Sequence, residues 1–224
     1  MALELDTSGD QIDHGDIAEF DAPSVLTFMF WAERTVETTA NMPFMQKAPT
    51  GAMWLYRSSA SANNFTVGQQ GISEKVSAAE AFPVDDWTHL GFVFDNTATP
   101  KLTLKVNGVN SGSGDDVTSL GDGGVNPFLV QWVNGIMRFA HLKAWAAALT
   151  DEEFLTEKGV GPVQRSANNI LACAYDTLAA TDLSPSGYHG THTGAVVVAG
   201  PSFPVDPTPN LAQRTRQMSP LLAQ

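Results

Sequence analysis

Apolar and polar positions alternate over short stretches of the chain, which is the pattern of half-buried β-strands. A denser run, Ser24–Glu33 (SVLTFMFWAE), combines β-branched and aromatic residues and predicts a central strand. Glycine, proline, asparagine and aspartate separate these stretches, as expected of turns. The other predicted strands are Ala2–Asp6, Gln11–Gly15, Met42–Lys47, Ala52–Ser58, Asn64–Gln69, Lys75–Ala79, Asp86–Phe94, Lys101–Val106, Phe128–Val133, Gly135–Trp145, Asn169–Tyr175 and Ala195–Ala199.

Two local signals in the middle of the chain predict a hairpin and a helix. Two apolar runs meet at Asn107-Gly108, a dipeptide that favours a type I′ turn because both residues tolerate positive φ. Thr150-x-x-Glu153 has the spacing of a capping box, so a short helix is expected to begin at Thr150. Gly159 is the expected C-cap of that helix.

Many short strands and one short helix predict an all-β fold, an antiparallel two-sheet β-sandwich of jelly-roll type. We expect residues 1–200 to form this sandwich. From Pro201 onward the chain is spaced by prolines (PSFPVDPTPN), and proline at this density favours an extended segment over a sheet interior. Residues 201–224 are therefore predicted to form an extended C-terminal arm.

The charge balance narrows the classes of partner. The chain carries 24 Asp plus Glu against 12 Lys plus Arg, a formal net charge of −12. Nucleic-acid binding through a basic face is therefore not expected, since it depends on cationic contacts to phosphate. Cys173 is the single cysteine, which excludes an intrachain disulfide. We also predict no membrane span and no signal peptide, because the sequence has no long apolar run and an acidic N-terminal stretch.

Several motifs in order resemble one family. WTHLGFVFD, then LTLKVNGV, then MRFAHLKAWAAALTDEEF are similar to the "W-x-H-(V/L)-A" strand, the "L-Y-V-N-G" hairpin and the "W-x-x-x-L-(S/T)-x-x-E" ending of laminin-G-like, concanavalin A-like domains. The opening ALELDTSGDQIDHG and the strand SVLTFMFWA resemble the start of the same family. The resemblance implies a jelly-roll sandwich. The resemblance does not identify one function, because the family includes lectin-like binders, adhesion modules and phage or viral structural proteins.

One motif occurs at a different position along the chain than in the family. TDLSPSGYHGTHTG resembles the family's "D-x-S-G-N-G-x-x-G-T-x-x-G" element, which often opens such domains but here follows the predicted helix. The resemblance therefore implies a partly permuted chain, in which residues 170–199 supply closing strands to the same sandwich.

No catalytic motif is complete, and we expect the protein not to be an enzyme. Glu4-x-Asp6 has the alternation of the E-x-D-x-x-E acids of sandwich-fold glycosidases, but the third position is Gly9. An ordinary solvated strand face explains the two acids better. His189 and His192 suggest zinc, but nearby residues do not supply the further ligands that zinc needs.

Calcium is the most reasonable small ligand, although the fold requires no cofactor. Calcium takes roughly 6–8 oxygen ligands, which acidic loops can supply. Asp10, near the start, and Asp182, in the D-x-S element, are the candidate ligands, and several family members bind calcium at a loop edge. The alternative is that these acids only solubilise the protein. Further acids lie near Asp10 and in the predicted loop Ser111–Pro127: Asp13, Asp16, Asp115, Asp116 and Asp122.

Carbohydrate binding would require exposed aromatic rings beside polar groups. Trp54, Tyr56 and Trp132 are the candidate ligand-binding residues. Trp54 and Tyr56 alternate onto one face of a strand, so they fit a core position as well. The remaining tryptophans fall on family core strands and are expected to be buried: Trp31, Trp87 and Trp145.

Three hypotheses of function follow. The first is a non-enzymatic phage virion surface component, such as a capsid decoration or tail-associated protein, assembled in the host cytoplasm. Arg214 and Arg216 in the arm would then bind an acidic neighbour, either another virion protein or a second copy. The second is a carbohydrate-binding module or lectin that uses calcium and recognises a cell-surface glycan. The third, a glycan-degrading enzyme, is disfavoured by the incomplete acid set.

Overall fold

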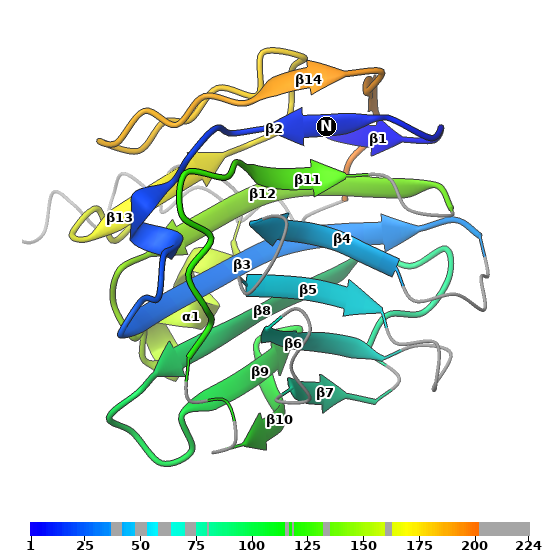
Figure 1. Cartoon of the computed structure of the whole chain (residues 1–224). Coiled ribbons are helices and arrows are strands. Elements are labelled where there is room, and N and C mark those ends of the chain that lie inside the picture. The colour runs from blue at the N-terminus through cyan, green and yellow to red at the C-terminus, as the bar shows by residue number, and fades with distance from the viewer. Residues whose placement is uncertain are drawn as a thin grey trace, which may run out of the picture.

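The protein folds as two antiparallel β-sheets packed face to face in this computed structural model (Figure 1). The structure describes residues 1–36, 42–47, 53–57, 64–69, 75–79, 81–114, 117, 119–131, 135–159 and 163–201. These residues include a 3-10 helix at Ala18–Phe20 and the α-helix α1 (Asp151–Lys158). The strands are β1 (Ala2–Leu5), β2 (Gln11–Asp13), β3 (Val25–Arg34), β4 (Met42–Lys47), β5 (Met53–Arg57), β6 (Phe65–Gln69), β7 (Lys75–Ala78), β8 (Thr88–Asp95), β9 (Leu102–Val106), β10 (Val109–Gly114), β11 (Phe128–Gln131), β12 (Met137–Trp145), β13 (Asn169–Cys173), β14 (Thr191–Thr193) and β15 (Val196–Val198).

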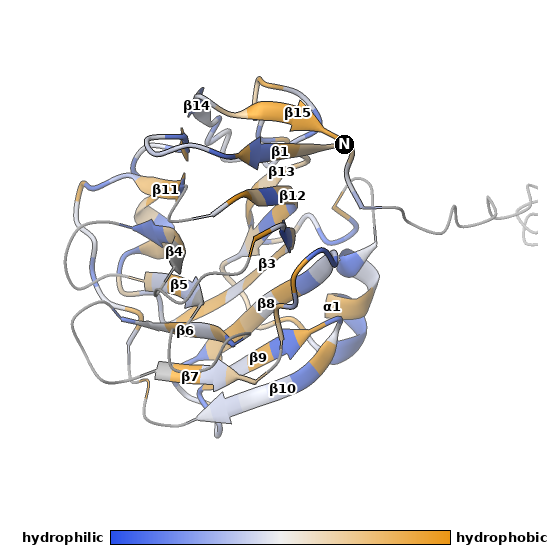
Figure 2. Cartoon of the chain, turned by 90° about the vertical axis from the view of Figure 1, so that its right-hand side faces the viewer, coloured by the Kyte–Doolittle hydropathy of each residue, from blue (hydrophilic) through white to orange (hydrophobic). Residues whose placement is uncertain are grey.

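The strand order confirms the predicted two-sheet jelly-roll sandwich. Among the described residues, one sheet has seven strands in the order β14-β2-β11-β4-β5-β6-β7. The other has eight, in the order β10-β9-β8-β3-β12-β1-β15, with β13 also paired to β12. Figure 2 shows the two sheets as separate layers, with α1 outside the eight-stranded sheet.

Phenylalanines from both sheets interlock in the core. Strand β3 lies in the middle of the eight-stranded sheet, and its Phe28 is fully buried. The ring of Phe28 stacks on Phe92 of the neighbouring strand β8, with centroids 5.7 Å apart. It also meets Phe128 of the opposite sheet edge to face at 5.7 Å. Each such aromatic contact stabilises the fold by about 0.5–1.5 kcal/mol beyond the contribution from burying its apolar surface.

The predicted hairpin and helix cap are confirmed. Asn107 and Gly108 have φ values of 53° and 85°, as the turn between β9 and β10 requires. The Thr150 hydroxyl accepts a hydrogen bond from the Glu153 amide, and the Glu153 carboxylate accepts one from the Thr150 amide. Helix α1 then packs its Phe154 into a second apolar cluster on the outer face of the eight-stranded sheet.

The C-terminal strands close the sandwich beside the first strands, as the permuted motif order implies. Strand β15 pairs with β1, and β14 pairs with β2, all antiparallel. Strand β13 pairs with the C-terminal half of β12. The backbone at Gly200 lies so close to Met1 that a Cβ at position 200 would be 2.6 Å from the Met1 carbonyl oxygen. Residues from the two ends of the described chain therefore share one edge of the molecule.

Three local expectations were wrong. Residues 111–114 belong to strand β10 and not to the predicted loop, because they pair with β9 through a bulge. Thr191–Thr193 was not among the predicted strands, but it forms β14 because β2 offers it a free edge. Trp31 and Trp87, which were expected to be buried, are only half-buried. Trp145 is fully buried as expected, and it packs with Phe154 of α1.

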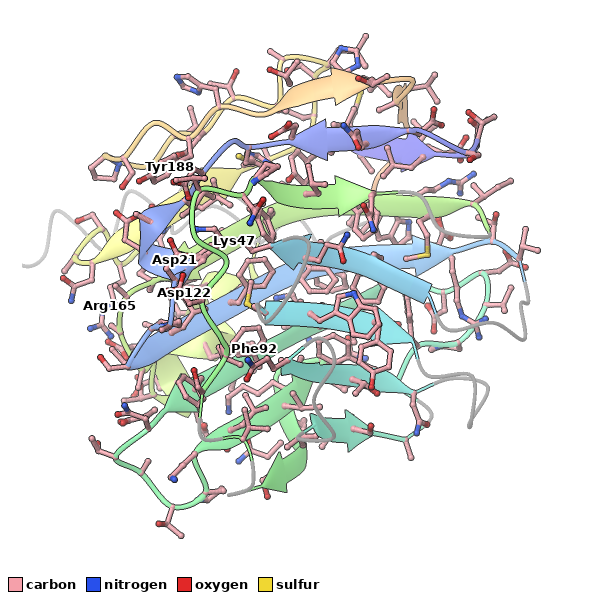
Figure 3. All side chains as sticks on the ribbon, in the orientation of Figure 1. Asp21, Lys47, Phe92, Asp122, Arg165 and Tyr188 are labelled. Carbon is pink, nitrogen blue, oxygen red and sulfur yellow. The ribbon has the colours of Figure 1, made fainter. Side chains whose placement is uncertain are left out.

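Two buried lysines form ion pairs that connect different elements of the fold. The Lys47 ammonium binds the carboxylates of Asp16 at 2.8 Å and Asp21 at 2.7 Å (Figure 3). Under α1, the Lys143 ammonium donates to the backbone carbonyl of Glu157 at 2.8 Å and to its carboxylate at 3.1 Å. Their side chains are 6% and 1% exposed, so this pair is almost completely removed from water.

Candidate functional site

The outer face of the seven-stranded sheet carries the aromatic residues that the sequence singled out. Met53 and Leu55 of β5 point into the core, so Trp54 and Tyr56 point away from it. The indole and phenol rings contact each other, with centroids 4.8 Å apart and planes inclined by 35°. The two residues therefore lie outside the core cluster between the sheets, although Tyr56 is buried as the core alternative expected. Trp132, the third candidate, lies outside the described residues.

The strand register surrounds Trp54 with small and polar neighbours. Trp54 is paired with Gln46 of β4 on one side and with Gly68 of β6 on the other. Gly68 has no side chain and is itself buried. In the next row, Tyr56 is paired with Thr66. Thr66 is fully buried and its hydroxyl bonds with that of Ser77, so Gln46 is the polar neighbour placed to meet a ligand.

The two rings differ in access and in hydrogen bonding. Trp54 is half-buried, whereas Tyr56 is only 6% exposed and supports the indole from the side. The Trp54 Nε1–H is shielded from solvent, and no hydrogen-bond acceptor for it lies among the described residues. A buried indole N–H normally has a partner, so this donor is an exception, and a ligand would reach it only if the atoms that cover it moved.

The calcium candidates lie in separate hydrogen-bond networks. The Asp10 carboxylate accepts from the amides of Asp6 and Thr7 and from the Thr7 hydroxyl, at 2.9–3.0 Å. The Asp182 carboxylate accepts four hydrogen bonds, from the amides of Ala172, Ser184 and Tyr188 and from the Ser184 hydroxyl, at 2.6–2.9 Å.

Both carboxylates thus have protein donors where a metal would need to approach. Three of the other acids are also in use, since Asp13 and Asp122 accept backbone amides and Asp16 binds Lys47. Asp115 and Asp116 lie outside the described residues. Within the described part of the chain, no three His, Cys, Asp or Glu residues are grouped to hold a metal ion. The calcium hypothesis stays a prediction.

Three further residues considered from the sequence, Glu4, His189 and Cys173, have structural roles. The Glu4 carboxylate binds Arg138 at 2.6 Å and is 14% exposed, so the expectation of a solvated strand face was wrong for Glu4. The Nδ1 atom of His189 accepts the Asp182 amide at 3.0 Å. Burial raises the pKa of Cys173, so the thiol stays protonated.

A buried histidine connects the second strand to the closing loop. His14 is 3% exposed, and its ring nitrogens lie 2.7 Å from the Tyr175 hydroxyl and 2.9 Å from the Tyr188 carbonyl oxygen. Burial lowers the pKa of His14. It raises the pKa of Tyr175 well above its ordinary value. This pair therefore stays neutral and fixes the loop that carries Asp182.

The fold defines a lectin-like β-sandwich. The chain belongs to the concanavalin A-like lectin/glucanases superfamily, because the model of that family matches residues 6–153. The resemblance to this family in the sequence is thereby confirmed. No curated protein matches the chain. Within the described residues, no helix is long and apolar enough to cross a membrane.

Solved structures support the same fold. A candidate carbohydrate binding protein from Bacteroides ovatus is 16% identical with a TM-score of 0.62, and the match covers 90% of this chain but 61% of that one. A heptameric SAP-like pentraxin from Limulus polyphemus is 13% identical over 87% of this chain and 94% of that one, with a TM-score of 0.57. The receptor binding domain of botulinum neurotoxin D is 11% identical over 69% and 42%, with a TM-score of 0.53.

Proposed function

We propose that this chain binds carbohydrate without transforming it, through the outer face of the seven-stranded sheet. The observation that carries the proposal is Trp54, a half-buried indole that faces away from the core and has an N–H without a described acceptor. The exposed part of the ring offers an apolar surface to a sugar ring, and the covered N–H would donate to a sugar hydroxyl only if the atoms over it moved. Gln46 stands beside the indole as a polar group that would fix orientation.

The family and one neighbour support this proposal. The superfamily takes its name from lectins and glucanases. The Bacteroides ovatus protein is itself named as a candidate for carbohydrate binding. The missing third acid after Glu4 and the engagement of Glu4 by Arg138 favour binding over glycan hydrolysis.

Replacing Trp54 by alanine tests the proposed glycan site. A glycan array with the intact chain identifies the ligand, and calorimetry then compares the variants. Trp54→Ala should lower affinity roughly 30-fold or more, since a central tryptophan contributes about 2 kcal/mol or more to binding. Trp87→Ala removes another half-buried tryptophan and should leave affinity unchanged. Equal affinity of W54A and the intact chain, or an array without any ligand, would contradict the proposal.

The same measurement repeated with a chelator tests the calcium hypothesis. Loss of glycan binding in the chelator, restored by added calcium, would support Asp10 and Asp182 as ligands. If the chelator leaves the glycan affinity unchanged, the glycan is recognised by protein groups without calcium, and the calcium hypothesis is contradicted.

The virion surface role is a second proposal, supported by sequence features. The sandwich is acidic, and the proline-spaced residues 201–224 carry Arg214 and Arg216, a combination suited to binding an acidic neighbour or a second copy. All but the first of these residues lie outside the described part of the chain.

Deleting Val205–Gln224 tests the arm. The melting temperature of the sandwich should change little, while assembly, measured by analytical ultracentrifugation of the intact and truncated chains, should be lost. The double variant R214A/R216A should weaken assembly in the same direction. Identical sedimentation of intact and truncated chains, or a large loss of melting temperature, would refute an assembly role for the arm.

A further inference from the structure

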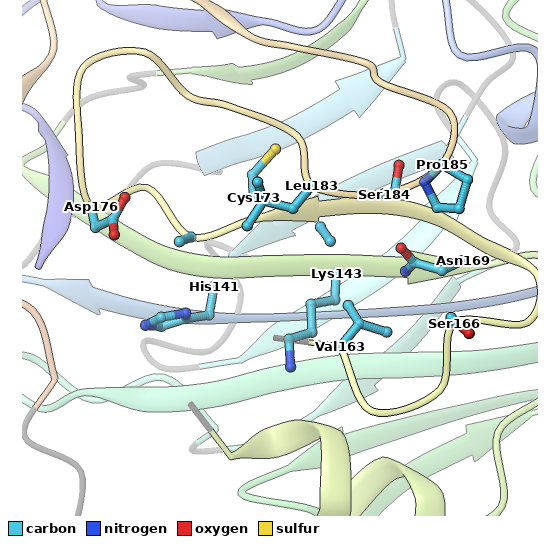
Figure 4. A pocket seen from close by; sticks show the side chains of 12 residues that line it. His141, Lys143, Val163, Ser166, Asn169, Cys173, Asp176, Leu183, Ser184 and Pro185 are labelled. Carbon is cyan, nitrogen blue, oxygen red and sulfur yellow. The ribbon is translucent and has the colours of Figure 1, made fainter. Parts of the chain in front are cut away.

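A cavity of about 580 Å³ opens on the outer face of the eight-stranded sheet (Figure 4). Lys143 of β12 is paired with Ala172 of β13, whereas the adjacent pair, Leu142 and Cys173, faces the core. Lys143 and Ala172 therefore lie on the outer side, where they line the cavity. The proposed glycan face, with Trp54, belongs to the other sheet.

A bulge in β12 shapes this cavity. The register between β12 and β3 shifts between Ala140 and Lys143, and His141 has a φ of 50°. Its amide donates to the Ala174 carbonyl at 3.0 Å, which joins β12 to the end of β13. Bulges of this kind redirect side chains and are frequent beside functional sites. Here the bulge places His141 among the lining residues.

The lining is mainly apolar, and its size suits a small molecule. Val163 and Pro185 come from the segments that flank the strands, and Ala172 and Ala174 come from β13 and the residue that follows it. Leu183 also lines the cavity and remains 70% exposed, which is unusual for so large an apolar side chain. Cavities of about 300–1,000 Å³ with apolar walls are the usual sites of small organic ligands.

The positive charge and most polar atoms of the cavity are already engaged. The Lys143 ammonium is bound by Glu157, so that its aliphatic stem is the part left to contact a ligand. The Ser184 hydroxyl bonds with the Ile170 carbonyl and the Asp182 carboxylate.

The remaining polar groups include the acceptors of Asn169 and Asp176 and the Ser166 hydroxyl, which can donate or accept. Both N–H groups of the Asn169 amide go to the carbonyls of Ala144 and Leu171, which leaves its oxygen. The Asp176 carboxylate is exposed and has no partner among the described residues. Asp176 lies at the same end of the cavity as His141, and its negative charge acts to raise the pKa of the His141 imidazole. The positive charges that also act on His141 are Lys143, which is paired, and the amino terminus at Met1, whose residue is 65% exposed.

We propose that this cavity binds a small apolar amine, with the ammonium group at Asp176 and the apolar body over Ala172 and Ala174. The apolar walls select a hydrocarbon or aromatic body, while the free acceptors and the unpaired carboxylate select a cationic donor over a neutral or anionic group. The net charge of −12 further favours the approach of a cation. This site is distinct from the glycan face.

Three molecules of one shape test the charge preference: tryptamine, tryptophol and indole-3-propionate, titrated into the intact chain by calorimetry at pH 7.5. Tryptamine should bind three- to fivefold more tightly than the neutral alcohol, the range expected for an exposed ion pair, and the carboxylate should bind more weakly than both. Asp176→Asn should remove the preference, so that tryptamine and tryptophol bind within twofold of each other. Asp86→Asn, at another exposed carboxylate, should leave the preference unchanged.

Ala174→Trp fills the cavity and should abolish binding of all three molecules, with circular dichroism and melting temperature confirming that the variant folds. Trp54→Ala should retain tryptamine binding, which separates this site from the proposed glycan site. The proposal fails if none of the molecules binds saturably, if tryptamine and indole-3-propionate bind equally, or if folded A174W binds tryptamine as the intact chain does.

Discussion

Glu157→Ala is expected to lower the free energy of unfolding by about 3–5 kcal/mol, the usual effect of removing one partner from a buried ion pair. The side chains of Lys143 and Glu157 are 6% and 1% exposed, so the ammonium left behind could not be hydrated without opening the structure. Burial already lowers the pKa of Lys143, against the stabilising charge of Glu157. The Glu157 carboxylate also accepts the Arg165 amide, and that bond would be lost with it. Urea unfolding followed by tryptophan fluorescence measures the change.

A second variant separates the ion pair from general damage to the helix. The double replacement K143M/E157L removes both charges and should recover most of the loss, because apolar residues of similar volume commonly replace a buried ion pair without cost. Glu152→Ala, at an exposed position of the same helix, should change stability by no more than about 0.5 kcal/mol. A loss below about 1 kcal/mol for E157A would contradict the role assigned to the pair.

Acidification from pH 7.5 to 4.5 is expected to destabilise the protein, and the loss begins above the pH at which the carboxylates titrate. Burial lowers the pKa of His14, of His89 (well below 6.5) and of His141 (to about 4). Positive charges, Lys158 and Lys143 for His89 and Lys143 for His141, act in the same direction. At pH 7.5 these imidazoles are neutral in both folded and unfolded chains and do not affect the balance.

Below pH 6.5 the unfolded chain binds protons first, so the free energy of unfolding falls with pH until each folded-state pKa is reached. For His141 the interval from 6.5 to about 4 corresponds to at most about 3 kcal/mol. Urea midpoints at pH 7.5, 6.0, 5.0 and 4.5 measure the decline. His141→Asn suits the positive φ of this position and removes its proton, so the variant should show a shallower decline. A midpoint independent of pH over this range would contradict neutral burial of the histidines.

Local chemistry explains which parts of the fold could be predicted. Asn107-Gly108 and the Thr150–Glu153 capping box carry their structure in the backbone preferences of a few residues, and both were predicted correctly. Strand β14 was missed because Thr-His-Thr has no apolar alternation, and it becomes a strand only through pairing with β2. Trp87 was expected in the core from its place in a motif, but the surrounding structure leaves it half-buried.

The candidate sites depended more strongly on tertiary structure. The alternation of Trp54 and Tyr56 predicted that they share a face, but only the sheet packing showed that the face is the outer one. The sequence did not indicate that the Asp182 carboxylate accepts four hydrogen bonds from protein groups. His141 and Asp176 lie far apart in the sequence without any motif, and the bulge in β12 that places His141 in the cavity has no sequence signal that we can identify.

The pairing of the first strands with the last ones sets the order of events during synthesis. Strands β1 and β2 each keep one open edge until residues 191–198 are available to form β14 and β15. Since these are among the most sequence-distant contacts in the fold, they come late and slow the closure of the sheets. On a ribosome, the amino-terminal strands must therefore wait with exposed edges until almost the whole sandwich has been translated, and this is the interval in which the nascent chain most needs protection by a chaperone.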